Sequence, residues 1–208
     1  MADRGLATCH FLDIRDIDER ARAAAWRLVP VSYRRRFLTC QDEAEAFRRL
    51  GSGILLSHVL GVHDDAQLER SPSGKPRLAE NRSIHFNLSH AGRLVVLATF
   101  ERPIGVDTEP LEAEEDPLLQ LALRKIYPAQ ALREATERSS GEFPLLSLWT
   151  EAEAALKARG CGFEGLDDGM DTRSALQGMH VHTAAIDHHL VSCASEADFD
   201  VEFRRAIP

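Results

Sequence analysis

Hydrophobic and polar residues alternate with different periods along the chain, and each period predicts a kind of element. Thr8–Ile14 alternates like a half-buried strand, and Ile17–Leu28 is a helical stretch rich in Ala and Arg. Asp42 can cap a helix that runs to Gly61, because its carboxylate can accept a hydrogen bond from the first turn. The remaining pattern predicts helices over Pro117–Ile126, Ala129–Glu137 and Leu145–Arg159, and strands over Ser83–Leu88, Leu94–Phe100, Ile104–Asp107, Met179–Ile186, His188–Ala194 and Phe199–Phe203.

Two segments between these elements have the composition of loops. Ser71–Pro76 is polar and contains Pro and Gly, and Gly160–Gly169 holds four glycines and three acidic residues. We expect the second loop to border a functional site. Helices followed by antiparallel strands occur in both halves of the chain, and this order predicts an α+β fold.

Composition limits the class of protein. The 208 residues are 44% hydrophobic and 28% charged, which is enough to build a substantial core in one domain or in two closely packed lobes. The sequence has no run of 18 apolar residues and no leader-like start, so we expect a cytoplasmic protein that does not contact a membrane. The cysteines are far apart and form no C-x-x-C pair, which predicts reduced thiols at Cys9, Cys40, Cys161 and Cys193.

The net charge of −8 argues against general binding of nucleic acid. Basic residues nevertheless cluster at Arg34–Arg36 and at Arg48 and Arg49. These clusters predict a locally positive contact face within an acidic protein. The alternative is that they are a solvated helix face or loop.

Asp107 and Glu109 are the first candidates for chemistry. They stand two residues apart in a stretch rich in Val, Ile and Thr, so in an extended strand both carboxylates point to one face. Two carboxylates on one face repel each other unless a cation lies between them, and oxygen ligands favour Mg²⁺, which often also binds substrate phosphates. The pair therefore suggests phosphate chemistry. The alternative is a strand that ends at a solvated turn before Pro110.

The helix predicted over Leu145–Arg159 adds two more candidates. Its apolar stripe packs on a core, and Glu153 and Lys157 lie four residues apart on the flank of that stripe, where they can face a cleft. As an ordinary surface pair they would contribute only about 0.3 kcal/mol. Glu151 points to the opposite, solvent side and is not expected to be a ligand. The stripe consists of Leu145, Leu148, Trp149, Ala152, Ala155 and Leu156.

Four short motifs, taken in order, resemble a known signature: Gly74-Lys75-Pro76, Phe86–His90 (FNLSH), Ile104–Pro110 (IGVDTEP) and Leu148–Gly160 (LWTEAEAALKARG). This order and spacing is similar to that of the 4′-phosphopantetheinyl transferases, specifically the long monomeric, surfactin-synthetase-activating type. The resemblance covers most of 72–162, the amino-terminal helices loosely, and the last forty residues hardly at all. The family's lysine just before the motif glutamate is Ala152 in this chain.

The resemblance implies a reaction and roles for several residues. A serine of an apo acyl- or peptidyl-carrier protein would attack the β-phosphorus of coenzyme A, leaving 3′,5′-ADP. Asp107, Glu109 and Glu153 would hold Mg²⁺, with Glu153 also the candidate general base, directly or through a bound water. Lys157 would face the pyrophosphate.

The same resemblance implies a set of contacts to the nucleotide of coenzyme A. Lys75, Pro76, Ser89 and His90 match such positions, and Arg48 lines up with them less securely. Each of these residues also has a purely structural interpretation. Lys75-Pro76 can form a turn, and the Ser89 hydroxyl can hydrogen-bond main-chain groups at a strand end. His90 can be an ordinary packed or surface histidine.

The family resemblance also implies an overall organisation. We expect two lobes related by a pseudo-twofold, each a small antiparallel sheet packed with helices, with 1–102 carrying the nucleotide contacts and 103–208 the metal and catalytic residues. We expect a monomer, since the chain would supply both halves of the site. We expect a carrier's acidic helix to be met by selected arginines and apolar residues.

Two other functions remain open from the sequence. One is a protein that binds coenzyme A or a carrier without transfer, suggested by Ala152. The other is an unrelated Mg²⁺-dependent phosphohydrolase that uses the same carboxylates.

The sequence also offers a second candidate metal site, made of histidines on one strand face and in the turn after it. They are His180, His182, His188 and His189.

Overall fold

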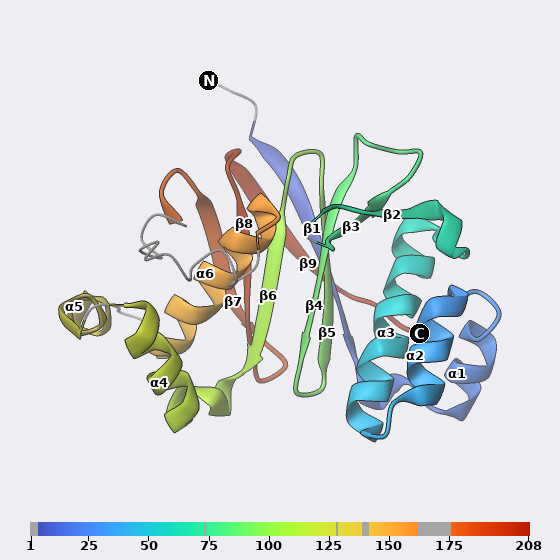
Figure 1. Ribbon diagram of the computed structural model, residues 1–208, viewed down its shortest axis with the longest axis horizontal. Coiled ribbons are helices and arrows are strands. Elements are labelled where there is room, and N and C mark those ends of the chain that lie inside the picture. The colour runs from blue at the N-terminus through green and yellow to red at the C-terminus, as the bar shows by residue number, and fades with distance from the viewer. Residues whose placement is uncertain (1–3, 73, 128, 139–141, 162–175) are drawn as a thin grey trace.

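The computed structural model describes residues 4–72, 74–127, 129–138, 142–161 and 176–208. Strands occupy the centre of the molecule, with helices α1–α3 on one side and α4–α6 on the other (Figure 1). Most strand pairs are antiparallel. This arrangement confirms the predicted α+β fold.

The larger sheet has four strands in the order β4-β5-β1-β9. They are β1 (Gly5–Asp13), β4 (His85–Ala91), β5 (Leu94–Phe100) and β9 (Phe199–Arg205). A second sheet has the order β6-β8-β7 and is antiparallel throughout. It consists of β6 (Gly105–Pro110), β7 (His180–Ile186) and β8 (His189–Ser195). Each of these strands overlaps a predicted one, because each carries its own apolar and polar alternation or an apolar run.

The carboxyl-terminal strand departs from the predicted organisation. The division into 1–102 and 103–208 places β9 with the second half, but β9 pairs in parallel with β1 in the first sheet. The reason is packing: Phe199 is fully buried in a core with Ala7 and Cys9 of β1. The pairing of β9 joins the two halves through a strand that local sequence pattern does not assign to a sheet.

The first half of the chain contributes three helices, α1 (Glu19–Ala25), α2 (Val31–Thr39) and α3 (Glu43–Leu60). The Asp42 carboxylate accepts a hydrogen bond from Glu45 N at 2.6 Å, which confirms the predicted cap. Gly61 ends α3 with φ of 65°, a conformation that glycine adopts at little cost. The buried face of α3, with Leu50, Ile54 and Leu55, packs in one core with β4 and β5.

One helix and two short strands of this half were not predicted. α2 lies where the sequence indicated only a basic cluster, and Ser71–Pro76 lies largely between the strands of a small hairpin, β2 (Leu68–Arg70) and β3 (Pro76–Leu78). Short 3₁₀ turns complete the described elements at Ile14–Asp16, Asp65–Gln67 and Leu111–Glu115.

The second half contributes α4 (Pro117–Ile126), α5 (Ala129–Arg138) and α6 (Pro144–Arg159). α6 packs across β6 and β8. This approach depends on Gly105, because a Cβ there would overlap Ala154 O and Ala158 N of the helix backbone. Glycine at the start of β6 therefore lets α6 lie directly on the strand that carries Asp107.

Some expectations concern features outside the site. All four cysteines are free thiols, as predicted, and Cys9 and Cys193 are buried. Within the described ranges, no helix has the length and apolar character to cross a membrane. The predicted loop Gly160–Gly169 lies outside the described residues from 162 onward.

Candidate functional site

β4 and β6 run next to each other where the two sheets meet. Asn87 of β4 joins them, since its Oδ1 accepts a hydrogen bond from Val106 N at 2.9 Å. The pairing brings the Phe86–His90 motif against the Ile104–Pro110 motif. Two segments that the sequence singled out separately thus form one seam.

Three polar side chains meet at this seam. Ser89 Oγ donates to Asp107 Oδ1 at 2.8 Å, and Lys157 Nζ lies 2.6 Å from the same oxygen and 3.1 Å from Ser89 Oγ. Ser89 and Asp107 are buried. The cluster therefore unites β4, β6 and α6, and it shows that three of the predicted site residues lie together.

Glu153 lies beside this cluster on α6. Its Oε2 is 3.7 Å from Lys157 Nζ, as the spacing of four residues predicts. Burial raises the pKa of Glu153 to about 7, opposed by Lys157 and reinforced by Asp107. The pKa of Lys157 is lowered by burial but raised more by Asp107 and Glu153, so the net shift is upward. An ammonium thus faces a carboxyl group that can exchange a proton near neutral pH.

Glu109 completes the acidic group. Burial and then the charge of Asp107 raise its pKa to about 7, while a hydrogen bond from Trp149 and the charge of Lys157 oppose the shift. Burial is the largest cause of the raised pKa of both Glu109 and Glu153. At Glu153 the attraction of Lys157 outweighs the repulsion from Asp107, whereas at Glu109 the repulsion from Asp107 outweighs the attraction of Lys157. A further cation would relieve that repulsion.

The donor set is suitable for a hard cation. Asp107 Oδ2 is buried and has no hydrogen-bond partner, so one oxygen of the central carboxylate is available to a ligand. Carboxylate oxygens are the ligands that Mg²⁺ prefers. Among the described residues, however, no three His, Cys, Asp or Glu side chains stand close enough together to form a metal-binding group. Lys157 is the cation that the acidic side chains face here.

A cleft of about 370 Å³ opens beside Ser89 and Lys157. Sequence reasoning missed two arginines that line it, Arg36 of α2 and Arg70 of β2. The Arg36 guanidinium lies over the Tyr33 ring at 5.4 Å, and Arg70 donates to Gly74 O at 2.9 Å. The one available signal was the basic run Arg34–Arg36. The other lining residues are Tyr33, Ser52, Pro76, Leu88 and His90.

His90 and Arg48 meet through a shared carboxylate. His90 Nδ1 lies 3.9 Å from Glu45 Oε2, and Arg48 Nε donates to the same oxygen at 2.8 Å. Arg48 also donates to Gly92 O. Burial lowers the pKa of His90, partly offset by Glu45. His90 therefore lines the cleft, whereas Arg48 is held by neighbouring groups and does not line it.

Lys75 is held by two main-chain oxygens. Its Nζ donates to Ile104 O at 2.9 Å and to Lys157 O at 2.5 Å, so it links the start of β6 to the end of α6. Burial lowers the pKa of Lys75 to about 8. Lys75 and Pro76 line a neighbouring cavity of about 350 Å³, and Pro76 also lines the main cleft. The nucleotide role of both residues stays a prediction.

Two features of α6 bear on the sequence interpretation. Glu151 was predicted to face solvent; it is partly buried, and its Oε1 accepts a hydrogen bond from Thr183 Oγ1 of β7 at 3.1 Å. Ala152 is 2% exposed, so the alanine packs beneath the helix as its place in the apolar stripe predicts.

The histidine alternative gains no support. His182 Nε2 is hydrogen-bonded to Phe199 O at 2.7 Å, and His189 Nδ1 to Asp187 O at 2.9 Å. His180 lies 3.5 Å from Asp198. In the described part of the chain these side chains do not form a metal-binding group.

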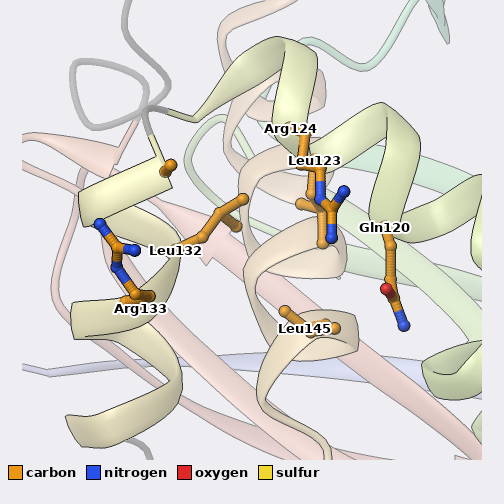
Figure 2. A pocket seen from close by; sticks show the side chains of 7 residues that line it. Gln120, Leu123, Arg124, Leu132, Arg133 and Leu145 are labelled. Atoms are coloured by element: carbon orange, nitrogen blue, oxygen red, sulfur yellow. The ribbon is translucent and has the colours of Figure 1, made fainter.

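A third cavity, of about 400 Å³, lies between α4, α5 and the start of α6 (Figure 2). Leu123, Leu132 and Leu145 face it, with Arg124 and Arg133 at its rim. It is slightly larger than the cleft beside Lys157, but none of the predicted site residues lines it. Size alone therefore does not identify the site; the cluster of buried polar groups does.

The sequence is similar to those of several known proteins. No family model matches the chain. The chain is 29% identical over 155 residues to 4′-phosphopantetheinyl transferase psf-1 of Bacillus pumilus, across 70% of this chain and 65% of that protein. It is 37% identical over 123 residues to a putative 4′-phosphopantetheinyl transferase of Synechocystis, across 56% of this chain and 49% of that protein.

A third relative matches over more of its length. The chain is 24% identical over 184 residues to 4′-phosphopantetheinyl transferase Sfp of Bacillus subtilis, across 79% of this chain and 80% of that protein. The matches cover less than two thirds of the length of the first two relatives.

Proposed function

Because the chain belongs to the 4′-phosphopantetheinyl transferase superfamily, we propose that it transfers the 4′-phosphopantetheine arm of coenzyme A to a serine of an apo acyl- or peptidyl-carrier protein. The other product is 3′,5′-ADP. The observation that supports this most directly is the meeting of Ser89, Asp107 and Lys157. Three motifs far apart in the sequence converge there beside a basic cleft.

The cleft is suited to a polyphosphate. Arg36, Arg70 and Lys157 line it, and no carboxylate belongs to the lining that the described residues provide. Guanidinium groups bind phosphate oxygens through pairs of N–H donors, and such charge-assisted bonds are strong. We assign Lys157 to the pyrophosphate of coenzyme A, and Arg36 and Arg70 to phosphate groups further along the cofactor.

Proton transfer is assigned to Glu153. Its raised pKa lets it accept the proton of the carrier serine near neutral pH. As the serine oxygen bonds to the β-phosphorus, the bond from that phosphorus to the bridging oxygen breaks, and 3′,5′-ADP carries the electron pair away. Lys157, which is held beside Asp107, stabilises the negative charge on the transferring group.

Asp107, Glu109 and Glu153 are the residues that would hold Mg²⁺. When bound, the ion would neutralise the pyrophosphate and the charge that grows during transfer. The unpartnered Asp107 Oδ2 and the mutual repulsion of these carboxylates support the assignment.

We further propose that the protein acts as a cytoplasmic monomer. Ser89 from the first half and Asp107, Glu109, Glu153 and Lys157 from the second form one cluster within one chain. A second copy is therefore not needed to complete the site. The partners would be coenzyme A and a carrier protein, with no role for nucleic acid or membrane.

The test is a transfer assay with the full chain, coenzyme A, Mg²⁺ and several apo carriers. A mass gain equal to the phosphopantetheinyl group on the carrier serine is the expected result. The Glu153→Gln variant should stay folded by circular dichroism and should not label the carrier. Full labelling by this variant would rule out the roles given to Glu153.

The alternative functions give different results in the same assay. A non-catalytic binder would retain coenzyme A in a binding measurement but add no mass to any carrier. A phosphohydrolase would release free phosphate from nucleotides in the absence of a carrier. Either outcome would overturn the transferase proposal.

A further inference from the structure

A row of polar side chains crosses the second sheet at the level of the candidate site. Asp107 of β6 stands opposite Ser192 of β8, and Ser192 stands opposite Thr183 of β7. Directly paired residues in antiparallel strands place their side chains on the same face. The row therefore extends from the central carboxylate to the far edge of the sheet.

Hydrogen bonds connect most of this row to α6. Thr150 Oγ1 lies 2.8 Å from Ser192 Oγ, Ser192 Oγ lies 2.9 Å from Thr183 Oγ1, and Thr183 Oγ1 donates to Glu151 Oε1 at 3.1 Å. Thr150 and Ser192 are fully buried. We call these four residues, Thr150, Ser192, Thr183 and Glu151, the hydroxyl chain.

Glu151 sets the direction of the hydroxyl chain. An ionised carboxylate only accepts hydrogen bonds, and each hydroxyl has one proton to donate. Since Thr183 donates to Glu151, Ser192 donates to Thr183. The Thr150 proton then lies between two acceptors, Ser192 Oγ at 2.8 Å and Leu146 O at 3.0 Å. The chain thus starts and ends on the same turn of α6 and clamps that turn to both β8 and β7.

A merely space-filling role does not account for the carboxylate. Burying a charged group costs free energy that an apolar side chain of similar size would not. What the carboxylate adds is an acceptor that orients the hydroxyls of Thr183 and Ser192. The inner part of the hydroxyl chain, Thr150 and Ser192, is shielded from water, and hydrogen bonds in such surroundings hold the elements they join more firmly.

The clamped turn lies just before the functional residues of α6. With a rise of about 1.5 Å per residue, Glu153 is about 3 Å and Lys157 about 9 Å further along the helix axis. A shift or rotation at Thr150 and Glu151 is therefore carried to both side chains. Misplacement of reacting groups by about 1 Å can cost about a hundredfold in rate.

We propose that the hydroxyl chain fixes α6 on the sheet so that Glu153 and Lys157 reach the Asp107 cluster, and that Glu151 is a positioning residue for the transfer reaction. The inference rests on the proposed function, because the reaction it serves is the one proposed above. Glu151 itself touches neither the cleft nor the reacting groups.

The test uses four variants and one matched control. Glu151→Ala, Thr183→Val and the double variant break the chain, and Glu151→Gln keeps an oxygen that accepts from Thr183. The control is Ser195→Ala. Ser195 is on the same strand as Ser192 and equally buried, but its hydroxyl donates to Pro103 O, outside the hydroxyl chain.

Turnover per folded molecule should fall about tenfold in Glu151→Ala and in Thr183→Val, and by no more in the double variant, because both act through one chain. KM for coenzyme A should stay within about twofold, and Glu151→Gln should behave like the wild type. Ser195→Ala should lower the melting temperature without changing turnover. A purely structural role would instead lower the melting temperature of every variant and leave turnover per folded molecule intact, which would overturn the proposal.

A second measurement does not depend on transfer. Amide hydrogen exchange within 150–157 should accelerate in Glu151→Ala and Thr183→Val, but not in Glu151→Gln or Ser195→Ala. Unchanged exchange in the first two variants would contradict the inference even if the wild type labels carriers. If the wild type labels none, the proposed function fails, and the exchange pattern still decides whether the hydroxyl chain holds α6.

Discussion

Lys157 Nζ lies 2.6 Å from Asp107 Oδ1, so α6 is joined to β6 by an ion pair at the centre of the candidate site. Both side chains are largely withdrawn from water, with 28% and 5% of their surface exposed. Charge pairs in such surroundings are costly to break because the remaining charge is left without a partner. The pair therefore has both a structural and a functional consequence.

Lys157→Met removes the cation from this pair. We expect the free energy of unfolding to fall by about 3 kcal/mol, because Asp107 is left buried with only Ser89 as partner. Coenzyme A affinity and transfer should both decrease, by about tenfold and at least about a hundredfold, because the lysine serves binding and reaction alike. Urea unfolding, calorimetric titration and the labelling assay measure the three effects. Adding Asp107→Asn should restore part of the stability but not the labelling.

Gly105→Ala tests the approach of α6 to β6. The new Cβ would overlap main-chain atoms of Ala154 and Ala158, which cannot rotate away, so we expect a loss of at least about 3 kcal/mol in unfolding free energy. Gly178→Ala is the control, since its φ is 75° but a Cβ there meets no atom of the described residues within 4 Å. That variant should lose only about 1 kcal/mol through backbone strain. Equal losses in the two variants would mean that α6 does not depend on the glycine.

Arg36→Gln and Arg70→Gln test the cleft. Each should weaken coenzyme A binding about tenfold in a calorimetric titration, because a charge-assisted hydrogen bond to phosphate is lost. Arg35→Gln, on the same helix but outside the lining, should bind like the wild type. Repeating the titration with 3′-dephospho-coenzyme A identifies the phosphate concerned: a variant that loses no further affinity for this ligand contacts the 3′-phosphate. Wild-type affinity in both variants would remove the arginines from the site.

The buried ammonium of Lys75 predicts a dependence of stability on pH. Its pKa falls from 10.5 to about 8 on folding, so between these values the unfolded chain binds more protons than the folded one. The free energy of unfolding should therefore rise with pH through this window, by on the order of 2 kcal/mol. The comparison is Lys75→Met, measured by urea unfolding from about pH 7.5 to about pH 10.5. Parallel profiles for the two proteins would contradict the prediction.

Mg²⁺ binding can be tested without the reaction. Mg²⁺ should raise the melting temperature of the wild type, since it binds the folded acidic group and not the unfolded chain. The shift should be lost in Glu109→Gln and retained in Glu151→Gln, which removes a carboxylate outside the proposed ligand set. An equal shift in both variants would mean that the ion binds elsewhere.

The local features of the sequence were sufficient for most elements. The cap at Asp42 and the period of four between Glu153 and Lys157 depend only on neighbouring residues, and both are found in the structure. The strands β5 and β8 are apolar along most of their length and were recognised for that reason. α2 was not predicted because its arginines interrupt the short apolar pattern by which a helix is recognised.

The side-chain surroundings could not be read in the same way. The sequence predicts that Glu151 faces solvent and that Lys75 contacts a ligand. In the structure, Glu151 accepts a hydrogen bond from Thr183, and Lys75 donates to the main-chain oxygens of Ile104 and Lys157. Arg36 and Arg70 line one cleft although 33 residues lie between them in the sequence. Each of these outcomes depends on which distant strand or helix lies opposite.

The sequence by itself determined most of the helices and strands, the family resemblance and the acidic and basic residues that could carry chemistry, because periodicity, caps and motif spacing are properties of neighbouring positions. Only the tertiary structure decided that β9 pairs with β1, that Ser89 and Lys157 share one oxygen of Asp107, and that Glu151 faces the sheet. Those relationships come from long-range pairing and packing, which fix the partner of each side chain after its local conformation is set.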